Sequence, residues 1–468
     1  MNRPADMNRP APRRNGQVSF WWSDAGHDER RESLRGDVDA DVVIVGGGYT
    51  GLWSAYYLAE ADPGLRIVVL ESRFAGFGAS GRNGGWLTSA IAGSRSKYAA
   101  AHGRDAVLAL QREMIGTVDE VLARMTAEDI KADAVKGGVL QIARNRAQME
   151  RTRDMHAEEV AWGDPDAVLL DRDACLGRIA VAGTLGGVYS PHTARIHPVK
   201  LVRGLAAAAE RRGVRLLENS RVTSIEPGRV RTDRGSVRAP IVLRCTEGFT
   251  AALPGERRTW LPMNSSIMVT EPLSDATWDE IGWQGCEVLG DLAHAYIYAQ
   301  RTADGRIAFG GRGIPYRYGS RTDADGDTSA VTIRQLHDML VAMFPGVRGV
   351  GIDHVWSGVL GVPRDWCAQM SFSPSTGLGL AGGYVGHGVA TANLAGRTLR
   401  DLVLGRETAL TRLPHVNWTG RRWEPEPLRW LGVQAMYAAY RTADRRESAR
   451  DSKTSIIARV ADRISGRH

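Results

Sequence analysis

The hydrophobic pattern near the start of the chain predicts a strand, a helix and a second strand. Residues 41–45 ("DVVIV") are a continuous apolar, β-branched run, which is typical of a strand buried in a parallel sheet. Apolar positions then recur at helical spacing in "TGLWSAYYLAE". Residues 66–71 ("RIVVLE") form a second apolar strand that ends on a carboxylate. Together the three elements predict a βαβ unit.

Further along, the chain leaves this pattern and later returns to it. A long amphipathic helix is predicted from Arg104 to about Ile130. Between Trp260 and Tyr318 the sequence pattern changes to one of alternating strands, with Asp304 and Gly305 at a hairpin turn. From about residue 350 the strand and helix rhythm of the beginning resumes. The sequence therefore predicts a discontinuous α/β domain and a second domain built on antiparallel sheet.

Glycines gather directly after the first predicted strand. Gly46, Gly48 and Gly51 fit the pattern GxGxxG, and Glu71 lies 20 positions beyond Gly51. Glycines at this spacing permit a tight turn and bring backbone close to a pyrophosphate at a helix N-terminus. The carboxylate at the end of the second strand is placed to hold a ribose hydroxyl. This context predicts dinucleotide binding.

Two later glycine loops favour FAD over a nicotinamide cofactor. A simple nicotinamide site has no use for the loop at residues 73–89 ("RFAGFGASGRNGGWLTS"), whereas FAD needs backbone donors from its pyrophosphate to its flavin ring. Arg82 and Asn83 carry side chains that reach as far as a ring. In the third loop, Gly386, His387 and Gly388 open a helix after an apolar strand. A helix N-terminus aimed at the flavin would stabilise the anionic reduced ring.

Composition and charge exclude several other classes of protein. The chain of 468 residues is 43% hydrophobic and 24% charged, with no apolar run long enough to cross a bilayer. Its net charge of +7 is carried mainly by arginines mixed with acids, which argues against a nucleic-acid surface. Four widely spaced cysteines without a CxxC pair argue against a metal site and a disulfide framework, and for a cytoplasmic location. The start lacks a secretory signal, Met7 is an alternative start, and we expect the first residues to be disordered.

The glycine loops and three further stretches resemble one family of flavoproteins. "VVIVGGGYTGL", "GFGASGRNGG" and "GHGVA", with "RIHP" at Arg195–Pro198, "TADGRIAFGG" at Thr302–Gly311 and "VWSG" at Val355–Gly358, are similar to FAD-dependent oxidoreductases of the D-amino-acid oxidase type. The nearest branch is that of gamma-glutamylputrescine oxidoreductase. The resemblance spans about Phe20 to about Leu413.

This resemblance implies a set of residues around noncovalently bound FAD. The expected cofactor contacts are Gly46, Gly48, Tyr49, Thr50, Gly51, Glu71, Ser72, Arg73, Ala79, Ser80, Arg82, Asn83, Gly84, Gly85, Val222, Thr246, Gly383, Gly386, His387, Gly388 and Val389. Of these, His387 and Arg82 would tune the flavin ring. Cys367 stands closer to the third loop than a covalent flavin attachment is expected to stand, so we predict that it is a small buried hydrophobe.

The resemblance also implies where the substrate binds. Tyr298 matches a tyrosine near the substrate, and Trp86 is expected to shape the pocket with it. The chain departs from the branch at Trp86 and at Ala299, Gln300 and Arg301, and we expect these positions to face the substrate.

Taken together, these patterns predict an α/β fold. A Rossmann-like FAD-binding domain of the glutathione-reductase type is expected beside a second, mainly antiparallel β-sheet substrate domain. The expected FAD-binding segments are 37–105, 185–255 and 350–410, the substrate domain is 106–184 and 256–349, the N-terminal tail and arm is 1–36, and a basic helical extension is 411–468.

The expected activity is amine oxidation. An amine would pass hydride from its α-carbon to flavin N5, giving an imine that hydrolyses to an aldehyde or keto acid, with O2 or a quinone as electron acceptor. The expected substrate is an acylated diamine like gamma-glutamylputrescine, or another primary or secondary amine. The alternatives are an oxidase or dehydrogenase of D-amino acids or of N-methyl amino acids (sarcosine or glycine type), a flavin monooxygenase, and a flavoprotein without turnover. The sequence does not indicate the oligomeric state.

Overall fold

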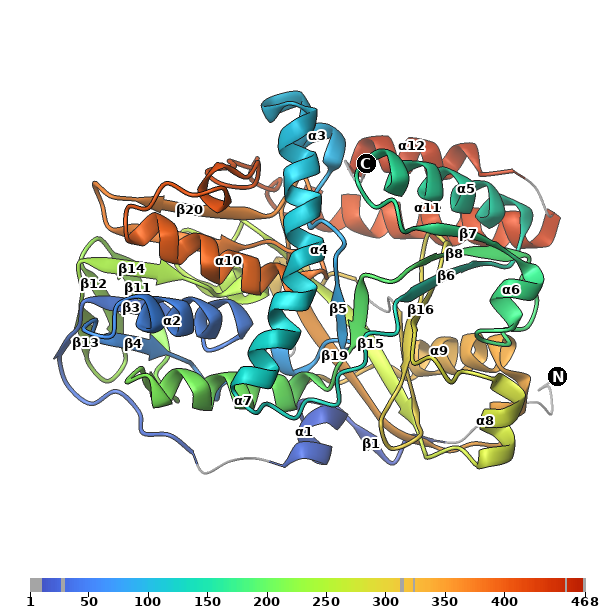
Figure 1. Cartoon of the computed structure of the whole chain (residues 1–468), viewed down its shortest axis with the longest axis horizontal. Coiled ribbons are helices and arrows are strands. Elements are labelled where there is room, and N and C mark those ends of the chain that lie inside the picture. Colours follow the sequence, from blue (N-terminus) through green and yellow to red (C-terminus); the bar gives the residue numbers. More distant parts are fainter. Residues whose placement is uncertain (1–10, 27–29, 312–314, 323–324, 451–452, 466–468) are drawn as a thin grey trace.

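Two large β-sheets stand side by side in the computed structural model, which describes residues 11–26, 30–311, 315–322, 325–450 and 453–465. In Figure 1 a six-stranded sheet lies on the left and a nine-stranded sheet on the right, with helix α4 (Arg104–Ala127) running between them. This arrangement is the predicted α/β fold with a second, mainly antiparallel sheet.

The six-stranded sheet contains the predicted βαβ unit. Its strands lie in the order β10 (Arg215–Leu217), β4 (Ile67–Leu70), β3 (Val42–Val45), β14 (Ile241–Arg244), β21 (Leu378–Gly382) and β20 (Gln369–Ser373). Every neighbouring pair is parallel except β20 with β21. Helix α2 (Tyr49–Ala61) connects β3 to its parallel neighbour β4, which confirms the prediction.

Both faces of strand β3 are buried, which explains its unbroken apolar run. Val42 and Ile44 pack in a core with helices α2, α7 (Pro198–Arg211) and α10 (Gly388–Val403). Val43 and Val45 pack on the opposite side. There they meet a four-stranded sheet made of β11 (Val222–Glu226), β12 (Arg229–Thr232), β13 (Ser236–Arg238) and β2 (Val38–Asp39).

The nine-stranded sheet forms the core of the other half. Its order is β1 (Arg14–Asn15), β19 (Ile352–Val362), β15 (Leu261–Thr270), β18 (Ile307–Gly311), β17 (Tyr298–Arg301), β16 (Val288–Asp291), β6 (Val139–Ala143), β8 (Gly186–Ser190) and β7 (Val168–Asp171). The antiparallel pairing of β17 with β18 around Asp304 and Gly305 confirms the predicted hairpin. Helices α8 (Asp275–Ile281) and α9 (Ala330–Met343) contribute to the same core, and α5 (Arg146–Ala161) and α6 (Arg172–Leu176) pack on the strands at the far edge of the sheet.

Three elements pack in the other half of the molecule from the one predicted for their segments. Strands β8 and β19 fall in the segments expected for the FAD-binding domain, yet both pair in the nine-stranded sheet. Helix α4 falls in the segment expected for the substrate domain, yet Val107, Met114 and Val118 pack in the core of α2 and α10. Hydrophobic periodicity identifies an element but not its long-range partner, so these placements depended on tertiary packing.

Both ends of the described chain are anchored to the body. Helix α1 (Phe20–Ala25) buries Trp21 and Trp22, and these two side chains anchor the N-terminal arm. Met1 and Met7 lie outside the described residues. Helix α11 (Leu428–Arg450) lies in the segment expected as a basic helical extension, and α12 (Ile456–Ser465) packs beside it.

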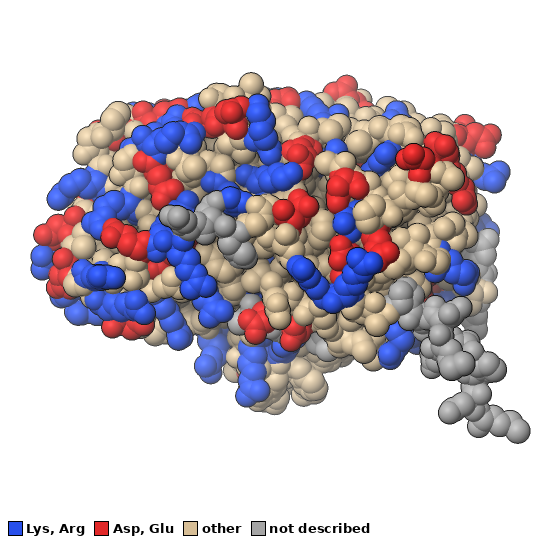
Figure 2. All heavy atoms as spheres, turned by 90° about the horizontal axis from the view of Figure 1, so that it is seen from below, with Lys and Arg blue, Asp and Glu red and all other residues tan. Residues whose placement is uncertain are grey.

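Two further observations concern the charged surface and the helices. Figure 2 shows Lys and Arg interspersed with Asp and Glu over the face seen from below. Within the described ranges, no helix has the length and apolar character needed to cross a membrane.

Candidate cofactor and active site

The first glycine loop is a turn that only glycine fits. Gly46 has a φ of +112°, and a Cβ there would lie 2.4 Å from the carbonyl oxygen of Cys245. A Cβ on Gly51 would lie 2.0 Å from the carbonyl oxygen of Gly46. Helix α2 then begins with Gly48 as its N-cap and without a side-chain cap. The loop therefore presents backbone N–H groups of a helix N-terminus at a point of very close packing.

Glu71 ends strand β4 beside this turn. Its carboxylate accepts hydrogen bonds from the N–H groups of Gly47 and Arg73, each at 2.9 Å. Burial raises the pKa of Glu71, while the same two N–H groups favour its charged form. The N–H of Ser220 donates to the carbonyl of Glu71 at 2.8 Å, which brings the start of β11 and Val222 to this end of the site. The structure thus brings together the residues predicted for the ADP half.

The second glycine loop is held by four successive backbone carbonyls. The carbonyl of Gly81 accepts a hydrogen bond from the side chain of Ser19 (2.7 Å), and that of Arg82 from Trp356 (3.0 Å). The carbonyl of Asn83 accepts from the side chain of Trp21 (2.9 Å), and that of Gly84 from Gln300 (2.7 Å). These donors come from the N-terminal arm, β19 and β17. A loop fixed on one side in this way is preorganised for a ligand on the other. The spacing of the glycines gave no signal for any of the four donors.

Arg82 and Asn83 support the same loop with their side chains. The buried guanidinium of Arg82 donates to the carbonyls of Phe77 (2.8 Å) and Ser357 (3.4 Å) and stacks on the Phe77 ring. The carboxamide of Asn83 accepts from the N–H of Gly85 and donates to the carbonyl of Ser80. These contacts fix the loop, and a contact of either side chain with the flavin ring stays a prediction.

Direct contacts join the three glycine loops. The N–H of Tyr49 donates to the Ser80 hydroxyl at 2.8 Å, which links the first loop to the second. The hydroxyls of Thr50 and Tyr384 lie 3.1 Å apart, which links the first loop to the third. The three loops therefore converge, as the resemblance implied.

The third loop begins helix α10 and is positioned by a residue that the sequence analysis missed. His387 is the N-cap of α10, and its side chain makes no capping bond. Glu247, three residues after the end of β14, accepts hydrogen bonds from the N–H groups of Gly383 (2.6 Å), Gly361 (3.2 Å) and Tyr384 (3.3 Å). It holds the loop against β19. Like Glu71, Glu247 is an acid that follows a buried strand of the six-stranded sheet. This shared position is the sequence signal by which it could have been found.

The predicted cofactor residues line a partly accessible strip between buried neighbours. Tyr49, Thr50, Gly51, Glu71, Arg82, Gly85, Gly383 and Val389 are buried, and Ser72 and Arg73 are exposed. The others keep partial exposure: Gly46, Gly48, Ala79, Ser80, Asn83, Gly84, Val222, Thr246, His387 and Gly388. A Cβ on the exposed Gly386 would meet nothing within 4 Å. Accessible backbone donors from two helix N-termini fit the phosphates and the ring of FAD.

Tyr298 and Trp86 stand together at the second loop, as expected for pocket walls. Their ring centroids lie 6.3 Å apart at 84°. The ring of Tyr298 packs on Gly84, where a Cβ would lie 2.8 Å away, and its hydroxyl lies 2.7 Å from that of Ser265. The indole of Trp86 donates to the carbonyl of Ala299 at 3.3 Å.

The expectation for the residues after Tyr298 is wrong at two positions. Ala299 is 1% exposed in the core, and Arg301 donates to the carbonyl of Trp283 and stacks on the Trp278 ring. Successive side chains of a strand point to opposite faces, so both point away from the face that carries Tyr298. Gln300 shares that face, where it is 1% exposed and supports Gly84. Cys367 is fully buried in the core, as predicted.

Glu247 is expected to give the stability of the protein a measurable pH dependence. Burial raises the pKa of its carboxyl to about 7, although the N–H groups of Gly383 and Gly361 favour the charged form. In the unfolded chain the ordinary value of 4.5 applies, so the folded state holds its proton more tightly. The stabilisation from this group is complete below pH 4.5 and is lost as the pH rises through about 7, by at most about 3 kcal/mol.

Urea unfolding across this pH range tests the prediction. The free energy of unfolding of the Glu247→Gln variant should lack this component, and the difference between wild type and variant should change with pH. Burial also raises the pKa of Asp291 to about 6. Because Asp291 is present in both proteins, its contribution cancels in the difference between them. Parallel pH profiles for the two proteins would contradict the assignment.

Comparison with known proteins gives one family for most of the chain. Residues 41–402 match the family model described as FAD dependent oxidoreductase. The chain is 31% identical over 416 residues to gamma-glutamylputrescine oxidoreductase of Escherichia coli (strain K12), with 86% of this chain and 93% of that protein covered. It is 24% identical over 379 residues to glycine oxidase of Bacillus licheniformis, with 78% and 93% covered.

Solved structures share the fold. Glycine oxidase from Geobacillus kaustophilus matches with a TM-score of 0.66 and 21% identity, over 82% of this chain and 100% of that one. L-proline dehydrogenase from P. horikoshii matches with a TM-score of 0.66 and 18% identity, over 82% and 98%.

Proposed function

This chain belongs to the FAD-dependent oxidoreductases that act on the C–N bonds of amines and amino acids, and we propose that its substrate is an acylated diamine. The reacting amine would stand at the end of an uncharged carbon chain, as in gamma-glutamylputrescine, which names the relative that is 31% identical. The observation that carries this proposal is the pair of aromatic walls, Tyr298 and Trp86, beside the second glycine loop.

Aromatic walls suit such a substrate better than they suit an α-amino acid. Methylene groups bury apolar surface against the rings. The carboxylate of an α-amino acid would instead need a free cationic partner near the reacting carbon. Arg82, the buried arginine of this loop, already directs its guanidinium to the carbonyls of Phe77 and Ser357.

The chemistry requires orientation and exclusion of water more than a strong base. FAD, when bound, accepts the hydride that leaves the carbon next to the amine nitrogen. The aromatic walls lower the pKa of the bound ammonium by desolvation, so that its proton leaves to water and the neutral amine reacts. Loss of the hydride from carbon and of a second proton from nitrogen gives an imine, which water hydrolyses to an aldehyde and ammonia. Bound FAD would pass the two electrons of that hydride to O2 or to a quinone.

An anaerobic screen tests the substrate class. Purified holoenzyme is mixed with gamma-glutamylputrescine, other acylated diamines, free polyamines, sarcosine, glycine and D-amino acids, and bleaching of the flavin absorption is followed. We expect acylated diamines to bleach the flavin fastest. Bleaching by glycine, sarcosine or D-amino acids alone would overturn the proposal, and repetition in air with peroxide detection separates an oxidase from a dehydrogenase.

Removing the hydroxyl of Tyr298 is expected to weaken turnover without loss of cofactor. Tyr298→Phe removes the hydrogen bond to Ser265 that fixes the ring, so kcat/KM for the best amine should fall roughly 5- to 10-fold. The flavin content should stay at the wild-type level. The control is Tyr318→Phe, because Tyr318 is 52% exposed and its ring contacts Trp430. Equal kcat/KM values in the two variants would show that Tyr298 does not contribute to the active site.

A further inference from the structure

Helices α11 and α12 carry large hydrophobic side chains on their exposed side. Six large hydrophobic side chains among the described residues are more than half exposed, and four of the six lie on these two helices. The four are Leu428 (63%), Leu431 (52%), Ile456 (75%) and Val460 (52%). A protein that stays monomeric in water rarely gathers exposed apolar side chains in one place, so this cluster indicates a contact surface.

The two helices bury their small residues and leave their large ones outside. Helix α12 lies alongside α11 at the upper right of Figure 1. Ala443 of α11 and both Ala458 and Ala461 of α12 are buried, whereas Ile456 and Val460 point to solvent. A helix that serves only to cover a protein core turns its branched apolar residues inward. Helix α12 does the opposite.

A hollow of about 270 Å³ lies between the two helices and is lined by apolar side chains. They belong to Met436, Ala439, Ile456, Ile457, Val460 and Ala461. An extended peptide buried in such a hollow would lose the hydrogen bonds that its backbone makes with water, whereas a hydrocarbon chain has none to lose. The hollow therefore favours an acyl chain over a peptide.

The charged side chains exposed on this part of the chain are all cationic. In the described residues of α11, of α12 and of the turn between them, the exposed charged residues are Arg441, Arg445, Arg446, Lys453 and Arg459. Within the part of the chain that the structure describes, no ion pair within 4.0 Å joins any of the five to a carboxylate. These cations are available to an anionic partner.

The acids of the same helices are used internally. Asp444 accepts hydrogen bonds from the N–H groups of His294 (2.8 Å) and Ala295 (3.0 Å). Glu447 is completely buried, and Asp462 accepts from the hydroxyl of Tyr440 at 2.8 Å. The surface formed by the four apolar side chains and the five cations, which we call the α11–α12 surface, is therefore apolar and positive.

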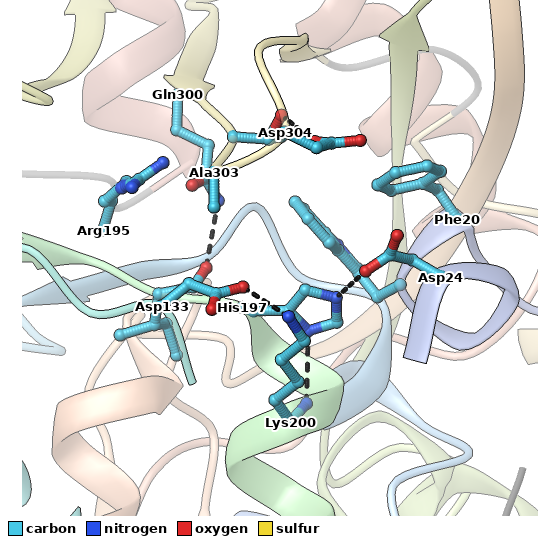
Figure 3. A pocket seen from close by; sticks show the side chains of 12 residues that line it. Phe20, Asp24, Asp133, Arg195, His197, Lys200, Gln300, Ala303 and Asp304 are labelled. Atoms are coloured by element: carbon cyan, nitrogen blue, oxygen red, sulfur yellow. Dashed lines mark hydrogen bonds and ion pairs between the residues drawn. The ribbon is translucent and has the colours of Figure 1, made fainter. Parts of the chain in front are cut away.

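The cavity beside the N-terminus of α7 has the opposite character (Figure 3). Lys200 Nζ lies 2.7 Å from Asp133, and Asp304 pairs with an arginine of its own hairpin. Asp24 and Arg195 stand on opposite sides of the cavity with opposite charges. Because these charges balance, the cavity does not select a ligand by charge, and the α11–α12 surface does.

We propose that the α11–α12 surface docks on a membrane that contains anionic phospholipids. The apolar side chains enter the boundary between headgroups and acyl chains, and the arginines and Lys453 meet the phosphate groups. A second copy of this chain fits the surface less well. A two-fold interface pairs a surface with itself, which would set these cations against one another.

Co-sedimentation with lipid vesicles tests the proposal on the purified holoenzyme. One set of vesicles is phosphatidylcholine alone, and the other is an equal mixture of phosphatidylcholine and phosphatidylglycerol. We expect binding to the anionic vesicles to be at least about 10-fold tighter, and to weaken as salt is added, because each cation near the surface contributes to it. Equal binding to the two sets, or no binding to either, would overturn the proposal.

The apolar contribution is tested by Ile456→Ser and Val460→Ser together. Both side chains are exposed, so the variant should fold and keep its flavin. Its affinity for anionic vesicles should fall at least about 10-fold, because two branched side chains no longer leave water. The control is Val331→Ser on α9, since Val331 is 54% exposed and lies on neither of the two helices. Equal loss of binding in variant and control would contradict the assignment.

The cationic contribution is tested by Arg445→Gln and Arg446→Gln together. This variant should bind anionic vesicles at least about 10-fold more weakly, with a smaller dependence on salt. Arg211→Gln is the control, because that side chain is 54% exposed on α7 and pairs with Glu128. Wild-type affinity and salt dependence in the double variant would contradict a role for these cations.

Sedimentation equilibrium without lipid separates the other possible occupant of the surface. A dimer that is lost in the Ile456→Ser and Val460→Ser protein, combined with no vesicle binding by the wild type, would assign the surface to a second copy and overturn the proposal. A monomer that binds anionic vesicles supports it. Vesicle binding is measured without amine, so failure of the amine screen leaves this test intact.

Discussion

Replacing Gly51 with alanine is expected to abolish stable FAD binding. The new Cβ would lie 2.0 Å from the carbonyl oxygen of Gly46 and 3.2 Å from Ile44, so helix α2 would have to move away from β3. Overpacking of this kind costs roughly 1–3 kcal/mol of stability. It also displaces the helix N-terminus that faces the phosphates, so the purified variant should carry little flavin.

Gly116→Ala is the matched control for this experiment. Gly116 lies within α4, is exposed, and would meet nothing within 4 Å if it carried a Cβ. Alanine there should be neutral or stabilise the protein by up to about 1 kcal/mol, with full flavin content. The measurements are the flavin-to-protein ratio after gel filtration and the urea midpoint. A Gly51→Ala protein with the flavin content of the control would show that the first loop does not bind the cofactor.

Loss of the Glu447 carboxylate is expected to release the C-terminal helices. Glu447 on α11 is completely buried, accepts from Arg151 and His294 at 3.0 Å each, and accepts from the N–H of Ser455 at 2.8 Å. One carboxylate thus connects α11 with α5, with the loop before β17 and with the start of α12. Glu447→Ala removes the only completely buried member of this pair and leaves the Arg151 side chain, 19% exposed, without its carboxylate, so it should cost about 3 kcal/mol, the lower end of the range for a broken buried ion pair.

Limited proteolysis and urea unfolding measure this effect. Glu424→Ala is the control, since Glu424 is 40% exposed in its pair with Arg364 and should contribute at most about 1 kcal/mol. Burial alone would raise the pKa of Glu447, but the bonds from His294 and Arg151 outweigh it and hold the pKa at about 2. Its contribution is therefore present above the ordinary value of 4.5 and is lost as the pH falls toward 2. Equal stability of the two variants at neutral pH would contradict this role.

The chain segments with strong local patterns were predictable from the sequence. The apolar run of β3, the helical spacing of α2 and α4, and the Asp304–Gly305 turn each reflect how side chains are distributed around a single element. The glycine spacing and Glu71 were equally readable, because a turn against a pyrophosphate demands the same residues wherever it occurs.

Placement across the molecule was not predictable in the same way. Local periodicity did not indicate that β19 joins the nine-stranded sheet or that Ala299 faces the core while Tyr298 faces the second loop. A strand has two faces with the same spacing, and its register against distant strands decides which one is buried.

The chain by itself determined the cofactor class, since close-packed glycines and a strand-end carboxylate are local requirements. Tertiary structure decided which groups complete the site. Glu247 beside the third loop and the four side chains that hold the carbonyls of residues 81–84 come from segments far apart in sequence. Their roles follow from burial and distance, which only the packed molecule defines.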